Sequence, residues 1–331
     1  MPHANLLLRS RAKTLLKKMA GTRILVLGDL MLDQFIWGSV DRISPEAPVP
    51  VICVERESAM PGGAANVASN IRALGGEALL MGVVGPDADG TRLRQELQGR
   101  GLSTEYIYVD RRRPTTTKTR IIGQRQQMVR IDREKNERVT GDLLEVIIEA
   151  AREAIPRVDG VVVEDYGKGL IHPGLLKPVI SMAKRARKVI TVDPKEEHIN
   201  YYRGVTALTP NRKEAALAAG VPITDEPSLH RAAQRILNRL KPEVLLITLG
   251  EDGMALFFKD GRKPVKIPTI AREVFDVSGA GDTVIAVFTL ARAAGASFSE
   301  AAVLANTAGG VVVEKVGVAT CSAEELIQRL S

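Results

Sequence analysis

Residues 276–283 read Asp-Val-Ser-Gly-Ala-Gly-Asp-Thr and lead directly into 284–293, an apolar stretch with the length and composition of a helix. The small residues at 279–281 let backbone N–H groups converge on an anion, and a helix N-terminus adds positive potential there. Asp282 then falls in the first helical turn, where it can take a proton from an attacking hydroxyl. The segment predicts a phosphoryl-transfer site; the alternative is a capping aspartate on a glycine-rich turn.

The rest of the chain alternates short, β-rich apolar runs with helical stretches. Strands that alternate with helices predict an α/β fold with a doubly wound, mostly parallel sheet flanked by helices. The expected strands are 24–27, 79–84, 160–163, 188–192, 206–209 and 244–248, and the expected helices are 5–19, 64–74, 142–155, 175–185 and 228–240.

Two segments interrupt this alternation. Residues 34–57 are rich in Val, Ile, Pro and Glu, and residues 105–133 alternate polar with apolar side chains, as in 117–122. Both patterns are typical of antiparallel strands that lie outside a main parallel sheet. Because the sequence has no linker, repeat or low-complexity segment, we expect one domain over 1–331 with a small β-sheet lid built from these two segments.

Composition excludes several classes of function. The apolar fraction of 45% allows a sizeable core, and the net charge of +7 fits either an anionic substrate or an ordinary solvated surface. Aromatic residues make up only 4%, which argues against nucleic-acid binding. The chain has two cysteines, no apolar run of the ~18 residues that a membrane span needs, and no signal-peptide core. We expect a cytoplasmic protein that binds neither nucleic acid nor membrane.

A second glycine cluster, Gly62-Gly63 followed by Asn66, also precedes an expected helix. Glycines allow close backbone approach and Asn is a poor helix-interior residue, so either ligand binding or helix–strand packing explains it. Other phosphate-binding patterns are missing: the sequence has no Gly-Lys-Ser/Thr loop and no protein-kinase catalytic loop. The turn at 279–281 also lacks the third glycine of the dinucleotide fingerprint, because Val284 holds that position.

These two glycine segments resemble the signatures of a known family. Gly62-Gly63 with Asn66, then Gly75 and Gly85, has the spacing of the first signature of the ribokinase-like carbohydrate kinases. Residues 276–288 resemble the second signature, with one departure at Val287, where the family usually has Ala or Gly. That position lies beyond the catalytic turn.

The resemblance extends to kinases that act on D-glycero-β-D-manno-heptose 7-phosphate in lipopolysaccharide core synthesis. In many of these relatives an adenylyltransferase domain follows the kinase; this chain ends at Ser331 and resembles the stand-alone form, with a separate adenylyltransferase acting downstream. The segments that carry this likeness are 28–33, 42–51, 165–169, 193–195 and 208–211.

The resemblance implies roles for particular residues. The catalytic base corresponds to Asp282, and the anion hole corresponds to the backbone of Gly279, Ala280 and Gly281. Glu214, in an Asn-x-x-Glu motif with Asn211, would help to hold Mg²⁺. The implied sugar-binding residues are Asp29, Asp33, Gly62, Gly63, Asn66, Asp193, and, for the sugar phosphate, Arg120 and Lys195, with Lys118 and Arg130 as further candidates. The implied ATP-binding residues are Asn211, Thr248, Gly250, Gly253, Ser278 and Asn306.

The sequence therefore predicts an ATP- and Mg²⁺-dependent kinase that phosphorylates the anomeric hydroxyl of heptose 7-phosphate to the 1,7-bisphosphate. The resemblance also implies a homodimer that pairs through the lid strands, whose exposed edges would otherwise be unprotected. Two alternatives stay open: another sugar or nucleoside kinase of this fold, or a non-catalytic sugar- or nucleotide-binding regulator. A pure binder has no need of a base, so Asp282 argues against the regulator.

Overall fold

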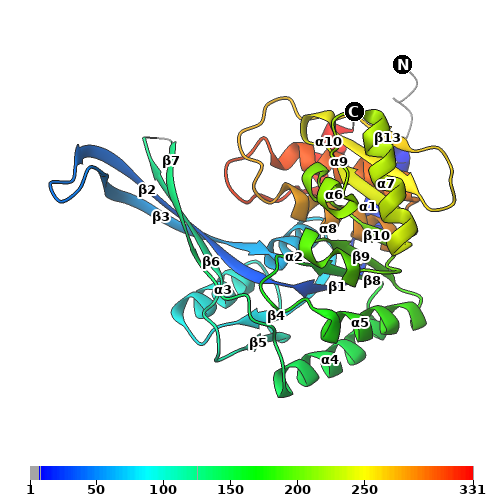
Figure 1. Cartoon of the computed structure of the whole chain (residues 1–331), viewed down its shortest axis with the longest axis horizontal. Coiled ribbons are helices and arrows are strands. Elements are labelled where there is room, and N and C mark those ends of the chain that lie inside the picture. Colours follow the sequence, from blue (N-terminus) through cyan, green and yellow to red (C-terminus); the bar gives the residue numbers. More distant parts are fainter. Residues whose placement is uncertain (1–6, 8, 125, 331) are drawn as a thin grey trace.

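The computed structural model describes residues 7, 9–124 and 126–330. In this part of the chain nine strands form one main sheet: β1 (Arg23–Gly28), β4 (Glu77–Val84), β5 (Ile107–Val109), β8 (Gly160–Glu164), β9 (Val189–Asp193), β10 (Ala207–Leu208), β11 (Val244–Thr248), β12 (Met254–Phe258) and β13 (Val265–Ile267). Their order is β13-β12-β11-β10-β9-β8-β1-β4-β5 (Figure 1). All neighbours from β11 to β5 are parallel, and β12 pairs antiparallel with both β11 and β13 at one edge.

Helices cover both faces of this sheet, because its strands are apolar on both sides. In β1, Ile24 and Val26 pack into one hydrophobic core, whereas Leu25 and Leu27 pack into the other. The first core is closed by α1 (Arg9–Met19), α2 (Ala64–Ala73), α3 (Ala88–Gly99), α8 (Ala280–Ala293), α9 (Phe298–Val312) and α10 (Ala323–Arg329). The second is closed by α4 (Asp142–Ala154), α5 (Pro173–Arg185), α6 (Arg212–Ala219) and α7 (Glu226–Leu240). The predicted doubly wound α/β architecture is confirmed.

The six strands predicted from the sequence all occur, with ends that differ by one or two residues. Helix α1 begins at Arg9; residues 5, 6 and 8 of the predicted helix lie outside the described residues. The strands β12 and β13 were not predicted from the sequence. No helix in the described ranges combines the length and the apolarity that crossing a bilayer requires.

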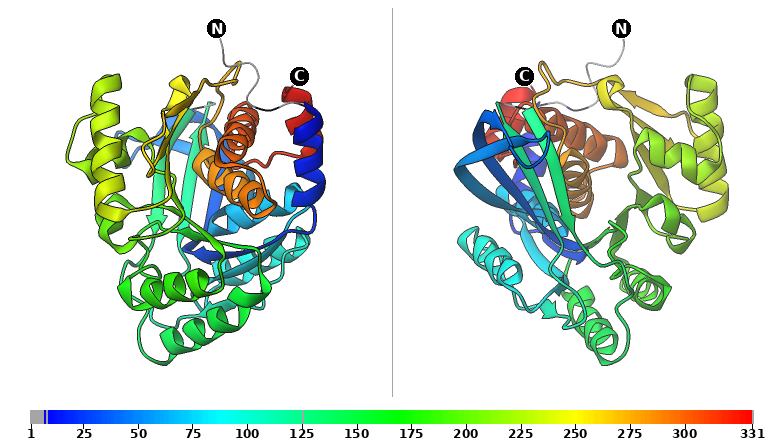
Figure 2. Two further views of the ribbon diagram at one scale, coloured as in Figure 1. Left: turned by 90° about the vertical axis from the view of Figure 1, so that its right-hand side faces the viewer. Right: turned by 60° about the vertical axis from the view of Figure 1, so that its left-hand side comes forward.

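A separate small sheet extends from the main body as one twisted blade (Figures 1 and 2). It contains β2 (Leu30–Ile43), β3 (Pro50–Gly63), β6 (Thr117–Gly123) and β7 (Gln126–Arg133), in the order β3-β2-β6-β7. The expectation of antiparallel strands was right for β2–β3 and β6–β7 and wrong for the central pair, since β2 and β6 are parallel. Residues 107–109, assigned to the lid from the sequence, instead pair with β4 in the main sheet.

The topology brings several strand ends to one place. In the sheet, β4 lies on one side of β1, and β8 followed by β9 lies on the other side. Ligands of doubly wound proteins bind at the carboxyl ends of strands where the order reverses in this way. Here Gly28, Glu164 and Asp193 are register partners at the ends of β1, β8 and β9. The small sheet arises at the same edge, because β2 follows β1 with a single residue between them.

Candidate active site

The glycine-rich turn at the start of α8 has the geometry of an anion-binding site. Gly279 is the N-cap in the left-handed region, with φ 76°, and a Cβ there would meet Asn66 Nδ2 at 2.6 Å. Asp276 shapes the turn by accepting the N–H of Ser278 over 2.9 Å. The first turn of a helix has N–H groups without intrahelical acceptors. Those of Gly281 and Asp282 have no acceptor among the described residues, so they are available to an anion.

Asp282 lies in this first turn and is only 3% exposed. Its Oδ2 accepts a hydrogen bond from Asn66 Nδ2 (2.8 Å), and its Oδ1 accepts one from the phenolic hydroxyl of Tyr166 (2.7 Å). Burial raises the pKa of Asp282 to about 6, while the two hydrogen bonds act in the opposite direction by favouring the carboxylate. The side chain is therefore ionised at neutral pH but basic enough to accept a proton.

Asn66 lies beside Asp282 and contacts it through its side chain. Its amide group donates to Asp282, and its Oδ1 accepts from Asn70 Nδ2 over 3.1 Å. Thr283 Oγ1 in turn donates to Asn70 Oδ1 over 3.1 Å. Asn66 is 1% exposed, so the chain of amides joins α2 to α8 inside the protein. The amide of Asn66 therefore orients Asp282, and its place in a sugar pocket stays a prediction.

Asp29 is bound by backbone groups of the loop that follows β8. Its carboxylate accepts backbone N–H groups from Tyr166 (3.0 Å), Lys168 (2.9 Å) and Leu170 (3.3 Å). It is 2% exposed, and burial raises its pKa to about 6. Gly63 packs tightly beside it, with φ 57° and space for no side chain, because a Cβ would meet the Asp29 carbonyl oxygen at 2.6 Å. Asp29 therefore holds the loop that carries Tyr166, and its contact with a sugar stays a prediction.

The small sheet contributes a carboxylate and two cations beside the base. Asp33 on β2 forms an ion pair with Arg120 on β6 (2.5 Å), and Gly62 leaves room for it, since a Cβ there would meet Asp33 Oδ2 at 2.0 Å. Lys118 Nζ lies 4.9 Å from the centre of the Tyr166 ring, and burial lowers its pKa. This arrangement is suited to a polar, anionic ligand, because acceptor and donor groups face the same region as Asp282.

The other two candidates for holding a sugar phosphate differ in position: Arg130 is the cross-strand partner of Arg120, whereas Lys195 lies outside the small sheet. Lys195 follows β9 and pairs with Glu196 over 3.1 Å, and it acts electrostatically on Glu214. Arg130 on β7 pairs with Asp132 over 2.8 Å and is well exposed. The structure therefore separates the two candidates that the sequence favoured: Arg120 is on the side of the small sheet, and Lys195 is on the side of α6.

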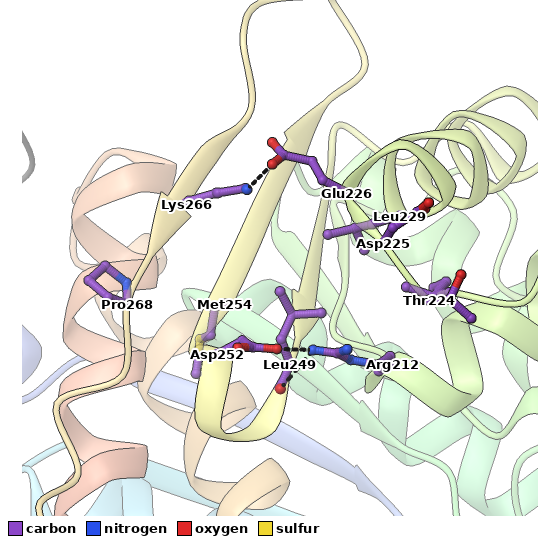
Figure 3. A pocket seen from close by; sticks show the side chains of 11 residues that line it. Arg212, Thr224, Asp225, Glu226, Leu229, Leu249, Asp252, Met254, Lys266 and Pro268 are labelled. Atoms are coloured by element: carbon purple, nitrogen blue, oxygen red, sulfur yellow. Dashed lines mark hydrogen bonds and ion pairs between the residues drawn. The ribbon is translucent and has the colours of Figure 1, made fainter.

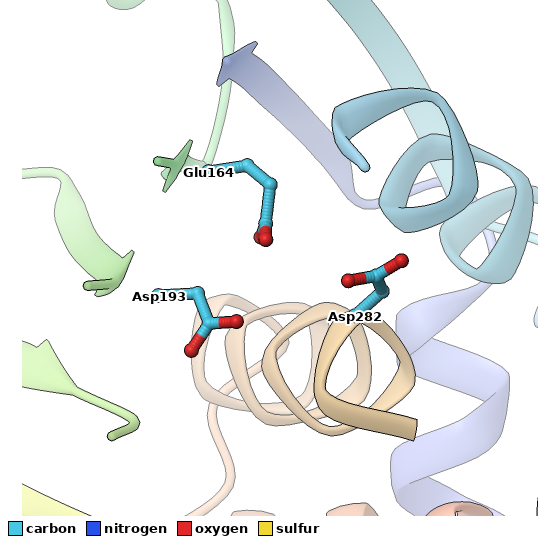
Figure 4. Close-up of side chains that lie close together, drawn as sticks. All are labelled: Glu164, Asp193 and Asp282. Carbon is cyan, nitrogen blue, oxygen red and sulfur yellow. The ribbon is translucent and has the colours of Figure 1, made fainter. Parts of the chain in front are cut away.

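Glu164 is a site residue that the sequence reasoning missed. It ends β8, is fully buried, and converges with Asp193 and Asp282 (Figure 4). Burial and the neighbouring carboxylates of Asp193 and Asp282 raise the pKa of Glu164 well above its usual range. Asp193, predicted to bind sugar, accepts a hydrogen bond from Thr209 Oγ1 over 2.9 Å and faces Glu164. The missed signal was a carboxylate at the end of a Val-Val-Val strand, next to Asp165.

A cavity of about 470 Å³ opens between β11, β12, β13 and the helices α6 and α7 (Figure 3). Of the residues predicted to bind ATP, Thr248, Gly250 and Gly253 do not line it but shape the loop that does. Gly253 has φ 81°, and a Cβ there would meet the Ile267 carbonyl oxygen at 2.1 Å. The lining residues are Arg212, Ile223, Thr224, Asp225, Glu226, Leu229, Leu249, Asp252, Met254, Lys266 and Pro268.

Two further predicted residues support the edges of this cavity. Asn306 Nδ2 donates to the carbonyl oxygen of Pro268 over 2.9 Å, so it holds a wall residue in place. Asn211 caps α6 in a capping box with Glu214, in which Asn211 N–H donates to Glu214 Oε2 over 2.8 Å. Because the cap engages one oxygen of Glu214, the other is left for an ion or water. Burial raises the pKa of Glu214, and its charge also acts on Asp193.

Comparison with known proteins adds to this geometry. Residues 22–325 match the model of the pfkB family carbohydrate kinases. The chain belongs to the pfkB family. It is therefore a sugar kinase, a phosphotransferase with an alcohol group as acceptor. The resemblance of the sequence to the ribokinase-like carbohydrate kinases is confirmed.

Relatives within this family cover most of the chain. It is 48% identical over 308 residues to the bifunctional protein HldE of Desulfatibacillum aliphaticivorans, which covers 93% of this chain and 63% of the relative. It is 46% identical over 319 residues to the bifunctional protein HldE of Geobacter metallireducens, which covers 96% of this chain and 65% of the relative. The chain thus spans less than two thirds of the length of these relatives.

Several solved structures share the fold of this pfkB kinase although their sequences are only about 20% identical to it. The structure of Arabidopsis thaliana ribokinase complexed with ribose and ATP has a TM-score of 0.74 at 22% identity and covers 94% of this chain and 99% of its own. Phosphofructokinase-2 from Escherichia coli in complex with substrates and products has a TM-score of 0.75 at 20% identity, over 94% and 98% of the two chains. These likenesses show the ribokinase-like fold.

Proposed function

We propose that this pfkB kinase transfers a phosphoryl group from ATP, with Mg²⁺, to the anomeric hydroxyl of D-glycero-β-D-manno-heptose 7-phosphate. The product would be the 1,7-bisphosphate, used in ADP-heptose and lipopolysaccharide inner-core biosynthesis. The observation that carries the kinase chemistry is the buried Asp282, oriented by two hydrogen bonds beside the free N–H groups of its own helix. The resemblance of the chain to heptose 7-phosphate kinases, and its 48% identity to an HldE protein, support the choice of sugar.

The residues of the chain fit a nucleotide and a metal ion. The cavity beside α6 has the size for a base and ribose, and Gly279 and Gly281 leave space at the anion-binding turn that side chains would fill. Hard carboxylate oxygens at Glu214 and Asp193 are the ligand type that Mg²⁺ prefers. When bound, MgATP supplies the phosphoryl group and neutralises negative charge.

The described side chains would act on the sugar as follows. Asp282 Oδ1 or Oδ2 accepts the proton of the attacking hydroxyl, which makes that oxygen nucleophilic. The N–H groups of Gly281 and Asp282 hold the charge on the transferred phosphoryl group during the reaction. Asp33 accepts hydrogen bonds from sugar hydroxyls once Arg120 turns from it toward the sugar phosphate. The small sheet covers this region and excludes water.

The decisive experiment is an assay of ADP release with a panel of sugars: heptose 7-phosphate, free heptose, ribose, fructose 1-phosphate and a nucleoside. We expect heptose 7-phosphate to be strongly preferred, and Arg120→Met to lower its kcat/KM by roughly 10- to 100-fold while free heptose is little affected. Arg56→Met, on the same sheet but stacked over Trp37, is the matched control. Equal kcat/KM for heptose and its 7-phosphate would reject the assignment of Arg120.

The proposal includes the oligomeric state and the cellular location of the enzyme. We propose a homodimer in which a second copy covers the small sheet, because its edge strands β3 and β7 expose apolar side chains. A cytoplasmic location fits two cysteines that are not in a disulfide. The exposed apolar residues are Val54 on β3 and Met128, Val129 and Ile131 on β7.

Sedimentation tests this assembly. Ile131 is 53% exposed on an edge strand, so Ile131→Asp is expected to leave the fold intact and to weaken dimerisation by placing a charge in the interface. Leu217→Asp, equally exposed but on helix α6 (56%), is the control. A wild-type chain that stays monomeric at high concentration would exclude the dimer.

A further inference from the structure

A buried aspartate joins the loop after β8 to the short 3₁₀ helix η2 (Glu196–Tyr201), which follows β9. The side chain of Asp165 is 0% exposed. Its Oδ2 accepts a hydrogen bond from the hydroxyl of Tyr202 (2.7 Å) and lies 2.8 Å from Nδ1 of His198. Its Oδ1 accepts the backbone N–H of Gly167 over 2.8 Å. Donors from two separate parts of the chain therefore converge on one buried carboxylate.

His198 differs from the other two donors, because it alone of the three can carry a positive charge. A carboxylate only accepts hydrogen bonds, so Nδ1 is the ring nitrogen of His198 that carries the proton in this contact. The hydrogen bond to Asp165 raises the pKa of His198. The charge of Asp165 also contributes, after burial, to the raised pKa of Asp29. Two buried carboxylates thus flank the loop, and His198 supplies a donor that offsets their charge.

Both segments that His198 joins carry residues of the proposed reaction. The loop after β8 carries Tyr166, whose hydroxyl donates to Asp282. The segment before η2 carries Lys195, whose carbonyl oxygen accepts the N–H of His198 over 2.9 Å. The two segments pack closely, since a Cβ on Gly167 would lie 3.5 Å from Cγ of Lys195. The side-chain contact of His198 therefore sets the position of one segment relative to the other.

We propose that His198 is a positioning residue for the phosphoryl transfer, because its hydrogen bond to Asp165 holds the loop that orients the catalytic base. The inference rests on the proposed role of Asp282 as that base. The ring of His198 stacks on Tyr201, with ring centres 4.9 Å apart, which fixes the direction of Nδ1. Its side chain is 22% exposed, so a substitution there leaves the two hydrophobic cores intact.

Two variants of similar shape separate the hydrogen bond from packing. Asparagine and leucine both branch at Cγ, but only asparagine places an N–H donor where Nδ1 of His198 lies. We expect His198→Leu to lower kcat by about tenfold with both KM values changed by less than about twofold, because the base is misoriented while binding is kept. His198→Asn should stay within about threefold of the wild-type kcat. The control is His230→Leu on α7, where the ring packs edge-on against Phe257.

A double variant tests the route by which His198 acts. If His198 and Tyr166 both act on the base through one loop, the effects of His198→Leu and Tyr166→Phe on kcat should combine to less than their product near neutral pH. Hydrogen exchange gives a readout that needs no substrate. The amides of residues 166–170 should exchange faster in His198→Leu than in the wild type or in His198→Asn.

All rates are measured below the melting transition of each variant, so a loss of stability alone leaves kcat unchanged. The proposal is overturned if His198→Leu keeps the wild-type kcat, if His198→Asn loses as much as His198→Leu, or if the two effects multiply. Should His198→Leu not fold, a tenfold lower kcat in His198→Asn overturns it, and a kcat close to the wild type supports it.

A failure of the proposed function is visible separately. The kinetic comparison uses whichever sugar of the panel the enzyme accepts, so a different substrate does not affect it. Full activity of Asp282→Asn would reject the base, whereas unchanged exchange of residues 166–170 in His198→Leu would reject the hold of His198 on the loop.

Discussion

The phenolic hydroxyl of Tyr166 donates to Oδ1 of Asp282 over 2.7 Å, which ties the loop after β8 to the first turn of α8. The loop is itself held by Asp29, which accepts its backbone N–H groups. The orientation of Asp282 therefore depends on the end of β1, the loop after β8 and, through Asn66, on helix α2. Tyr166 acts as a positioning residue, since its hydroxyl contacts the base.

Asp282→Asn tests the base itself. Asparagine keeps the size of the side chain but does not accept a proton, so kcat should fall by about 10²–10⁴. The raised pKa of Asp282 means that the folded protein binds this proton more tightly than the unfolded protein does. The ionised carboxylate therefore lowers the free energy of unfolding as the pH rises above the usual pKa of an aspartate. In EDTA the variant should therefore be more stable than the wild type, on the order of 1 kcal/mol near neutral pH, with the gain shrinking in acid.

Calorimetry and ADP release over the same samples check both parts of this prediction, and the exposed, loop-borne Asp260→Asn serves as control. A variant that melts normally, binds ATP and phosphorylates sugar at close to the wild-type rate would show that Asp282 is not the base.

Tyr166→Phe tests the hydrogen bond to the base. The hydroxyl favours the ionised form of Asp282, so its removal raises the pKa of that group above about 6. The acid limb of the kcat/KM profile, which reports the free enzyme, should move to higher pH by about one unit. At pH values well above this acid limb, kcat/KM should fall less than it does at acid pH. The matched control is Tyr106→Phe; an unchanged profile in Tyr166→Phe would mean that the hydroxyl has no effect on the base.

Gly62→Ala tests the space around Asp33. A Cβ at this position would meet Asp33 Oδ2 at 2.0 Å, so the carboxylate must leave its position and its ion pair with Arg120. We expect KM for the sugar to rise by roughly tenfold or more, while KM for ATP stays unchanged. Gly99→Ala, in a helix with open space around it, should have no effect. An unchanged sugar KM in Gly62→Ala would remove Asp33 from the sugar site.

Hydrogen exchange tests whether the small sheet closes over bound sugar. If it does, amides of β2, β6 and β7 should exchange more slowly when heptose 7-phosphate is bound. Residues 107–109 belong to the main sheet and provide an internal control, because their exchange should not respond. Identical exchange with and without sugar, at saturating sugar, would mean that the small sheet does not close over the ligand.

The sequence predicted the parallel core strands well and the small sheet incompletely. Strand residues such as 160–163 are buried on both faces of the sheet, so a continuous apolar run is enough to predict the strand. The parallel pairing of β2 with β6 joins residues 32–38 to 117–123, and no local pattern reports a partner so distant along the chain. The short strand β5 was assigned to the wrong sheet for the same reason.

What the sequence determined by itself was the chemistry at α8: a glycine turn, a helix start and Asp282 in the first turn are all set by neighbouring residues. Only the tertiary structure decided what surrounds that aspartate. Asn66 and Tyr166 reach it from 216 and 116 residues away, and Glu164 meets it across the end of a sheet. A side chain's hydrogen-bond partners follow from which elements pack together, so the contacts of Asp29 with the loop after β8 and of Asn66 with Asp282 could not be predicted from the sequence.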